Sequence, residues 1–508
     1  MKSLFFSSAF YAVQMMQHQP VISLSRYKGD LYMAEIDREL VAQIVRNVVS
    51  ELEKQKPAAT AVQAFGVTNG IFEDINSAIN ASIEAQKVWM QTSREVKAKV
   101  IAALRQAMHR HAEEFARRAF EETGMGRLQD KIFKHHNVAD VTPGLEDLET
   151  RSWTGDKGLV VEDFAPYGVI AAITPSTHPV PVLLNSTIIM IAPGNSVVFN
   201  VHPAAKNVSA YAMEIFNRVI QENGGPANLI SMVREPTLDS AHALFNHDRI
   251  PIIVATGGPG PVRAAFAAAK KVIAAGPGNP PVLVDKSADL AAAARYIIDG
   301  AAFDNNIICI AEKEIFVVES VFDRFMQEMQ AAGAVRLSET QINALTEKAI
   351  LVSEKNQEPY PSRDFLGKNA NVLAKAAGLD LSDDVKMLFG ETNFDHPFVQ
   401  VEQMMPFLPV VRVKSADEGI ELSYRAEHNF GHTAIIHSND LDVITRFTRK
   451  MDTDIVAVNG PSLAGLGPKA GESYFSHTLA SPTGEGVCTP RNFARVRRLA
   501  MYKSLQIV

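Results

Sequence analysis

The sequence has 508 residues, enough chain for two or three domains that each bury a core. Its apolar content of 46% and charged content of 21% are typical of a soluble globular protein. The formal net charge of −7 argues against nucleic-acid binding, which needs a basic face. Two cysteines allow at most one disulfide and indicate a reducing, cytoplasmic compartment. No run of eighteen apolar residues occurs, so we predict no membrane span.

The N-terminal region reads as three parts. Residues 1–33 hold a weak apolar run without a convincing cleavage signal, so we predict a disordered or upstream tail, with Met33 as the natural start. Residues 34–54 form a predicted amphipathic helix, because apolar residues lie four apart: Ile36, Leu40, Ile44, Val48 and Leu52. Residues 55–67 read as a linker. The apolar stripe must pack on its own domain, on another subunit, or in a partner's groove.

A helical pattern extends from Asn69 to about Ala139. His135, His136 and Asp140 lie near its end, but they lack a clear further ligand, so we predict no metal site and surface positions for these histidines. A turn and a strand over residues 158–164 follow.

The chain then alternates strands with helices, which predicts an α/β fold with a parallel sheet. The predicted strands are residues 167–174, 195–200 and 250–256, and the predicted helices contain residues 183–191 and 204–220. The last strand ends in Thr256-Gly257-Gly258-Pro-Gly260 and enters a helix, and backbone amides at such a turn can bind a phosphate. Arg263 stands where the strict dinucleotide fingerprint has its third glycine, and similar turns also occur for structural reasons alone.

Cys309 follows three polar residues, Asp304, Asn305 and Asn306, and precedes an apolar strand over residues 315–318. A lone cysteine is most often a small core residue. A position where a loop meets a rigid element suits a reactive group instead. Cys488 has no such surroundings, and we predict no role for it.

Residues 300–318 resemble the nucleophile region of CoA-acylating aldehyde dehydrogenases, in particular the propionaldehyde and acetaldehyde enzymes of bacterial microcompartments. The resemblance runs from about residue 68 to the C-terminus. It implies a Rossmann-like cofactor domain, an α/β catalytic domain and a small oligomerisation β-hairpin. The implied divisions are 68–275 for binding dinucleotide and CoA, with the hairpin at 150–165, 276–480 for catalysis, and 481–508 for oligomerisation.

The resemblance also assigns roles to single residues. It makes Cys309 the nucleophile, with Thr177 or His178 and the backbone N–H of Cys309 as oxyanion donors. His432 would assist the CoA thiol, although a structural, hydrogen-bonded histidine remains equally open. Phe407 would pack against the nicotinamide, with Met405 in place of a ribose-binding glutamate. The implied NAD-binding or CoA-binding residues are Thr174, Pro175, Ser176, Asn200, His202, Pro203, Thr256, Gly257, Gly258, Ala275, Gly276 and Phe407.

Ala274 replaces the glutamate that activates water in hydrolytic relatives. Without that base, water should not hydrolyse a thioacyl enzyme readily, and a CoA thiol should accept the acyl group instead. We therefore expect a short-chain aldehyde, such as propionaldehyde, to be oxidised with NAD and coenzyme A. The helix at 34–54 resembles encapsulation peptides that bind shell proteins, which implies a microcompartment lumen, and a homodimer or homotetramer is expected. The alternatives are a hydrolytic aldehyde dehydrogenase with another base, and a non-catalytic cargo protein.

Overall fold

The structure is a computed structural model that describes residues 69–354, 357–467 and 471–506. The chain divides into a unit of residues 1–67 and a compact unit of residues 68–508. The predicted tail, helix and linker before residue 68 lie outside the described residues. Among the helices of the described part, none is long and apolar enough to cross a membrane.

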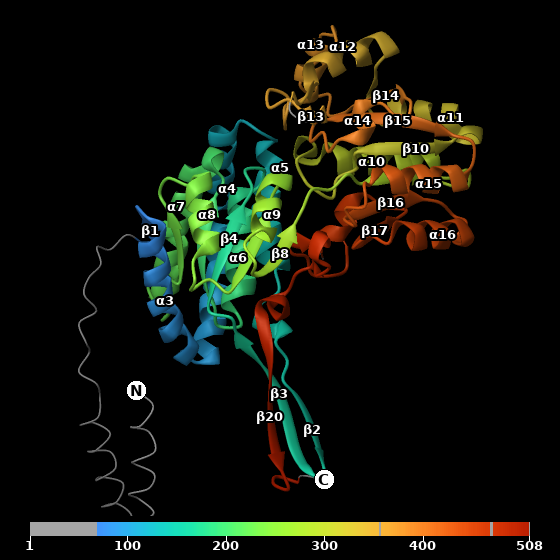
Figure 1. Ribbon diagram of the computed structural model, residues 1–508. Helices are drawn as coiled ribbons and strands as arrows, with labels where there is room; N and C mark the ends of the chain where they lie inside the picture. The colour runs from blue at the N-terminus through green and yellow to red at the C-terminus, as the bar shows by residue number, and fades with distance from the viewer. Residues whose placement is uncertain (1–68, 355–356, 468–470, 507–508) are drawn as a thin grey trace, which may run out of the picture. The chain divides into compact units, whose positions relative to one another are not determined.

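A parallel sheet of six strands, in the order β1-β6-β5-β4-β7-β8, forms the first half of the described unit (Figure 1). Its strands are buried because helices cover both faces. The strands are β1 (Ile71–Phe72), β4 (Val169–Thr174), β5 (Ser196–Val201), β6 (Ile230–Val233), β7 (Ile252–Thr256) and β8 (Lys271–Ala275). The helices are α3 (Ile75–Gln91), α4 (Arg94–Thr123), α5 (Leu128–Val141), α6 (Pro179–Ile191), α7 (Lys206–Glu222), α8 (Leu238–Asn246) and α9 (Pro259–Phe266).

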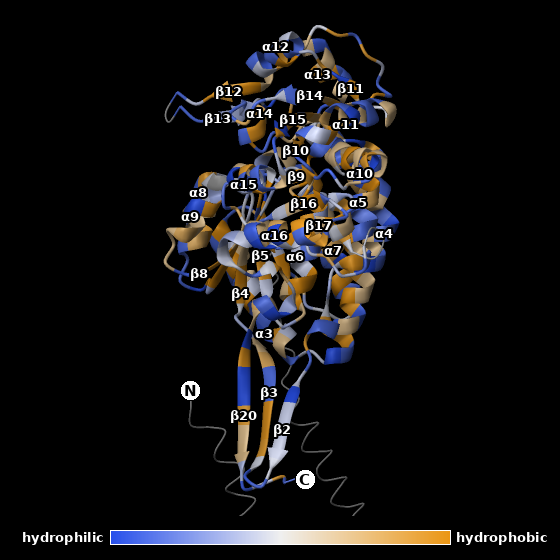
Figure 2. Cartoon of the chain, turned by 90° about the vertical axis from the view of Figure 1, so that its right-hand side faces the viewer, coloured by the Kyte–Doolittle hydropathy of each residue, from blue (hydrophilic) through white to orange (hydrophobic). Residues whose placement is uncertain are grey.

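A second parallel sheet has seven strands in the order β11-β14-β15-β10-β9-β16-β17. Its strands are β9 (Pro281–Val284), β10 (Glu314–Val318), β11 (Val335–Arg336), β14 (Leu388–Thr392), β15 (Phe407–Val413), β16 (Thr433–His437) and β17 (Ile455–Val458). The helices that pack around it are α10 (Leu290–Ala302), α11 (Glu319–Ala331), α12 (Glu339–Ala349), α13 (Ala370–Ala376), α14 (Pro397–Gln400), α15 (Ala416–Ala426) and α16 (Leu441–Met451). Figure 2 shows hydrophobic strands lying between helices whose outer sides are hydrophilic.

A three-stranded antiparallel sheet extends away from the two larger sheets (Figure 1). It contains β2 (Arg151–Gly155), β3 (Gly158–Pro166) and β20 (Ala494–Tyr502). The last strand of the chain therefore pairs with the predicted hairpin. Four large apolar side chains of this sheet are exposed: Trp153, Val496, Leu499 and Tyr502. Two short pairs complete the strands, β12 (Ile350–Val352) with β13 (Pro359–Pro361) and β18 (Leu479–Ala480) with β19 (Gly486–Val487).

The structure confirms the predicted α/β class and the predicted strands within one or two residues at most ends. β6 was missed, because four residues give too short an apolar run. The prediction of a surface position for His135 was wrong. This residue is 2% exposed and lies on the inner face of α5, where its ring stacks on Phe115.

Candidate active site

The first sheet has its topological switch point at β4 and β7, because β5 and β6 continue on one side of β4 and β7 lies on the other. Ligands bind to open α/β sheets beyond the carboxyl ends of the strands at such a point. Thr174 ends β4 and Thr256 ends β7, and each has a buried hydroxyl without a hydrogen-bond partner in the described part of the chain. Two neighbouring strands of the first sheet thus each end in a threonine hydroxyl that has no partner among the described residues.

The glycine-rich turn after β7 is open. A Cβ added at Gly257 or Gly258 would meet no atom within 4 Å. The turn leads into α9, whose first amide groups and dipole favour an anion. Pro175 and Ser176 are half-buried at the neighbouring end of β4. These residues fit the diphosphate of a dinucleotide.

Cys309 lies in the loop between α10 and β10 and is half-buried. The loop begins with three successive residues of left-handed backbone conformation, Asp304 (φ 48°), Asn305 (φ 55°) and Asn306 (φ 71°). Asparagine and aspartate tolerate this conformation better than other residues with a Cβ, but it persists only where surrounding contacts hold it.

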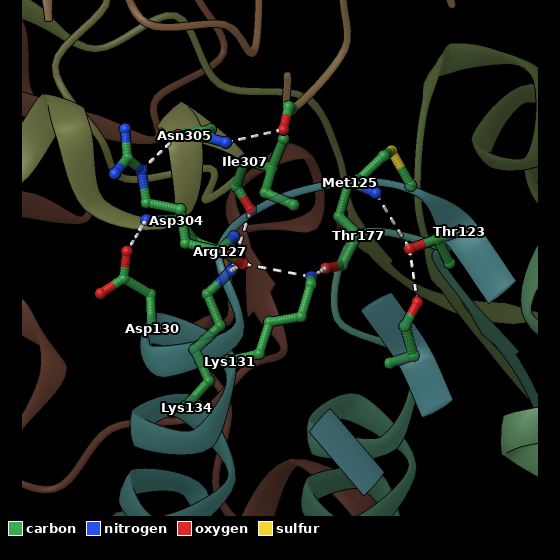
Figure 3. A network of polar contacts seen from close by, with 12 residues as sticks. Thr123, Met125, Arg127, Asp130, Lys131, Lys134, Thr177, Asp304, Asn305 and Ile307 are labelled. Atoms are coloured by element: carbon green, nitrogen blue, oxygen red, sulfur yellow. Dashed lines mark hydrogen bonds and ion pairs between the residues drawn. The ribbon is translucent and has the colours of Figure 1, made fainter. Parts of the chain in front are cut away.

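The contacts of Asp304 hold the first of these residues (Figure 3). Its carboxylate accepts hydrogen bonds from Lys134 Nζ (2.6 Å), Lys131 Nζ (3.3 Å) and the backbone N–H of Arg127 (2.6 Å), and both lysines are buried. Lys134 Nζ also donates to the carbonyl of Ile307 at 3.1 Å, two residues before Cys309. Helix α5 therefore fixes the cysteine loop from one side.

Asn305 and Asn306 hold the other side of the loop. Arg127 Nε donates to Asn305 Oδ1 (2.6 Å), and Asn305 Nδ2 donates to the Gly367 carbonyl (2.9 Å). The amide of Asn306 bonds the backbone on both sides of Cys309, and its Oδ1 accepts from the buried Lys313 (2.6 Å). The polar residues before the cysteine are thus structural, and they present its thiol.

The pKa of the Cys309 thiol is raised to about 11, because burial and, after it, the charge of Glu402 outweigh the opposing charges of Lys313 and Lys134. The free enzyme therefore holds this group as a thiol at neutral pH. Burial also raises the pKa of Glu402 to about 7, against the opposing charge of Lys313. A carboxyl group with that pKa can accept a proton near neutral pH.

His432 lies close to the cysteine loop. A Cβ added at Gly278 would come within 2.8 Å of the Cys309 carbonyl oxygen and within 2.9 Å of the His432 ring, so only a glycine fits between them. The His432 Nδ1 is 2.9 Å from the hydroxyl of Thr433. Burial lowers the pKa of His432 to about 3, so the ring is neutral.

A model of the aldehyde dehydrogenase family matches residues 45–470 of the chain. The chain belongs to the aldehyde dehydrogenase family.

Relatives within this family are named as CoA-acylating enzymes. The chain is 41% identical over 487 residues to an acetaldehyde dehydrogenase (acetylating) of Bilophila wadsworthia, covering 93% of this chain and 100% of that protein. A propionaldehyde dehydrogenase from the fucose utilisation microcompartment of Clostridium phytofermentans is 42% identical, with a TM-score of 0.83 and coverage of 86% and 100%. The Rhodopseudomonas palustris propionaldehyde dehydrogenase with bound CoA and an acylated cysteine is 38% identical, with a TM-score of 0.83 and coverage of 87% and 100%. The predicted resemblance to acylating aldehyde dehydrogenases is confirmed.

Several residues assigned to the cofactor by resemblance have structural contacts in this aldehyde dehydrogenase. The amide of Asn200 bonds Thr237 and Ser240, and His202 Nδ1 accepts from the N–H of Ala204, beside Pro203. A Cβ at Gly276 would meet Pro482 at 2.8 Å, and Ala275 is buried. Their contacts with a cofactor stay predictions.

Phe407 and Met405 are both 0% exposed and belong to the core cluster around α12 and α13, where Phe407 packs on Phe398. A nicotinamide contact would require the Phe407 ring to leave this core.

The sequence interpretation missed Glu402, which lies three residues before Met405 and whose charge acts on the Cys309 thiol. Lys131 and Lys134 were also missed, although they share a helix face with the apolar Val138.

Thr177 is half-buried, and its carbonyl accepts from Lys131 Nζ at 3.4 Å. Its role as an oxyanion donor stays a prediction. Its neighbour His178 is buried, and burial lowers the pKa of its ring. The loop after β4 and the cysteine loop are joined by Lys131, which donates to the Thr177 carbonyl and to Asp304.

Proposed function

We propose that the protein oxidises a short-chain aldehyde, such as propionaldehyde, to its acyl-CoA thioester, with Cys309 carrying the acyl group. The observation that carries this proposal is the position of Cys309. Its loop is fixed by buried ion pairs, and its carbonyl and the His432 ring both lie so close to Gly278 that a Cβ there would clash with them. The relatives named as acylating enzymes, one of them with an acylated cysteine, support the same reading.

Each residue around Cys309 has its own role in the proposed aldehyde oxidation. Glu402, with a pKa of about 7, takes the proton of the Cys309 thiol, and the sulfur attacks the aldehyde carbon to give a thiohemiacetal. The backbone N–H of Cys309 stabilises the oxyanion, and Lys134 adds positive charge nearby. A nicotinamide cofactor held at the edge of the first sheet would supply the hydride acceptor, and coenzyme A would supply the thiol that takes the acyl group. The neutral ring of His432 orients or deprotonates that thiol.

Binding of the nicotinamide cofactor is assigned to the edge of the first sheet. The free hydroxyls of Thr174 and Thr256 and the open turn at Gly257 and Gly258 form a polar cradle there. NAD is the expected cofactor. Coenzyme A would enter the same site after the reduced cofactor leaves.

We assign the location of the enzyme to residues near its N-terminus and its assembly to the three-stranded sheet that contains its last strand. Residues 34–54 would bind a microcompartment shell protein, which places the enzyme in the lumen of a cytoplasmic microcompartment. The exposed apolar side chains of β2 and β20 would pair subunits into a homodimer or homotetramer.

The test is the formation of NADH from a series of aldehydes with and without coenzyme A, with analysis of the product. We expect sustained turnover only with coenzyme A, and acyl-CoA as the product. Cys309→Ala should abolish turnover. Cys488→Ala is the matched control, because Cys488 is buried in the core of the first sheet, and it should retain turnover. Sustained NADH formation without coenzyme A would refute the proposal.

A hydrolytic reaction is the second candidate, and Glu402 is the observation in its favour. A carboxyl group with a pKa of about 7 near the thiol could also activate water, although residues 274–278 provide no carboxylate. Free acid as the product, lost in Glu402→Gln, would select this candidate.

A further inference from the structure

Three successive carbonyl groups of the cysteine loop, those of residues 306–308, accept hydrogen bonds from buried ammonium groups. Lys313 Nζ donates to the Asn306 carbonyl at 3.0 Å and to the Ile308 carbonyl at 3.4 Å. Between them, Lys134 Nζ donates to the Ile307 carbonyl at 3.1 Å (Figure 3). Lys313 is 0% exposed and Lys134 is 2% exposed. Positive charge therefore lies on the carbonyl side of the chain directly before the proposed nucleophile.

The backbone of Lys313 is fixed on both sides. Its N–H donates to the Pro280 carbonyl at 3.0 Å, and its carbonyl accepts from Gln403 Nε2 at 2.8 Å. Burial lowers the pKa of Lys313 to about 8, against the charges of Glu402 and Cys309, which raise it. The side chain is therefore an ammonium group at neutral pH, and it is held in one place.

The contact with Ile308 bears on the reaction, because the Ile308 carbonyl and the Cys309 N–H belong to one planar peptide group. The distance of 3.4 Å is long for a hydrogen bond, but a full charge still attracts a carbonyl dipole at that range. The N–H of Ala311 donates to the same oxygen at 3.1 Å. Donors on a carbonyl polarise its peptide group and strengthen the N–H on the other side as a donor. That N–H is the one assigned to the oxyanion.

We infer that Lys313 is a positioning residue for oxyanion stabilisation, in that its ammonium group orients and polarises the peptide group between Ile308 and Cys309. This inference rests on the proposed function and adds a residue to it. The bonds made and broken are unchanged. The Cys309 sulfur bonds the aldehyde carbon, the carbonyl electron pair moves to the oxygen, and Glu402 takes the thiol proton. Lys313 keeps its own proton throughout.

A purely structural role is the alternative for Lys313. Its bonds to Asn306 support the left-handed backbone of the loop, so its loss could displace Cys309 without any effect on the strength of the N–H as a donor. The two roles differ in one measurable quantity. Only a polarising ammonium group changes the acidity of a tetrahedral adduct that has already formed on Cys309.

The experiment uses ethyl trifluoromethyl ketone, an analogue of propionaldehyde with a trifluoromethyl group in place of the transferable hydrogen. The thiol adds to its carbonyl and the reaction stops there, because no hydride can leave. Fluorine NMR of the full chain as a function of pH gives the pKa of the adduct hydroxyl. We expect this hydroxyl to be at least about 100-fold more acidic than in the adduct of the same ketone with 2-mercaptoethanol, since one backbone donor is worth about 10² to 10³.

Lys313→Met removes the charge and keeps a long side chain. The adduct hydroxyl should become about 10-fold less acidic, because polarisation is part of the donor's effect. In CoA-dependent NADH formation, kcat should fall by about 10-fold with KM for the aldehyde unchanged, as for an interaction made only in the transition state. Lys368→Met is the matched control. Lys368 Nζ also donates to a backbone carbonyl, that of Gly124 at 2.7 Å, and this variant should keep the adduct pKa and kcat.

Two results would overturn the inference. One is an adduct hydroxyl in the unmodified protein that is no more acidic than in the 2-mercaptoethanol adduct, a comparison that needs no variant to fold. The other is an unchanged adduct pKa in Lys313→Met, whatever its melting temperature, which would leave Lys313 with a structural role alone. Failure of the proposed function would appear separately, as the absence of any adduct on Cys309 or as free acid in place of acyl-CoA.

Discussion

At the scale of single residues, Cys309 is a thiol whose surroundings oppose its ionisation. Burial is the largest cause, Glu402 is the next, and Lys313 and Lys134 act in the opposite direction. A pKa of about 11 leaves little thiolate at neutral pH. In the proposed mechanism, the thiolate of Cys309 would therefore form only as the aldehyde arrives and a base takes the proton.

Glu402→Gln should lower the pKa of Cys309. The carboxylate disfavours the thiolate only when it is charged, so the effect should appear at pH values above its own pKa of about 7. The measurement is the rate of Cys309 alkylation by iodoacetamide as a function of pH, with the exposed Glu121→Gln as the control. An unchanged or higher pKa in Glu402→Gln would show that this carboxylate does not act on the thiol.

Gly278→Ala should reduce turnover strongly and lower thermal stability. Its Cβ would press on the Cys309 carbonyl at 2.8 Å and on the buried His432 ring at 2.9 Å, and neither can move freely. Gly258→Ala is the comparison, because its Cβ would meet no protein atom within 4 Å. That variant should keep its melting temperature and show a raised KM for NAD. Equal behaviour of the two variants would contradict the assigned geometry.

At the scale of elements, helix α5 and the cysteine loop form one unit through the ion pairs of Asp304. Asp304 is 0% exposed and both lysines are 2% exposed. Removing one member of a buried pair leaves an uncompensated charge, which costs about 3–5 kcal/mol. The left-handed backbone of residues 304–306 would lose its support at the same time.

Asp304→Asn should therefore destabilise the protein by about 3–5 kcal/mol in urea unfolding and should also lower kcat. Lys134→Met should have a smaller effect, because Lys131 remains near Asp304. Arg117→Met is the control, since its pair with Glu121 is exposed and such pairs are worth about 0.3–0.5 kcal/mol. A loss in Asp304→Asn no larger than in this control would contradict the role of the network.

The sequence predicted those elements whose pattern is local. Strands such as β4 and β10 are continuous apolar runs, and Cys309, the proposed nucleophile, was singled out by its neighbours in the chain. The partners of the thiol could not be found in this way. Lys134 and Glu402 lie far from Cys309 in sequence, and only the packing of the two sheets brings their charges to it. The burial of Phe407 likewise depends on α12 and α13, which no local pattern connects to it.

At the scale of the whole molecule, residues 68–508 contain both sheets, the cysteine loop and the glycine-rich turn. The proposed chemistry therefore needs nothing from residues 1–67. Those residues carry the predicted shell-binding helix. Catalysis and targeting should be separable in one chain.

Deletion of residues 1–67 should leave CoA-dependent NADH formation within about two-fold of the full chain, because the remaining unit is compact. The same deletion should abolish co-sedimentation with microcompartment shells. Fusion of residues 34–54 to an unrelated fluorescent protein is the complementary control and should confer co-sedimentation. A truncated enzyme that still enters the shells would refute the targeting role.

The most direct test of the central claim is the chemical state of Cys309 during turnover. The protein is mixed with propionaldehyde and NAD without coenzyme A, quenched in acid and digested, and the peptides are analysed by mass spectrometry. We predict one acyl group per chain on Cys309 and none on Cys488, and loss of that group as acyl-CoA when coenzyme A is added before quenching. NADH formation with Cys309 unmodified throughout would contradict the thioester mechanism.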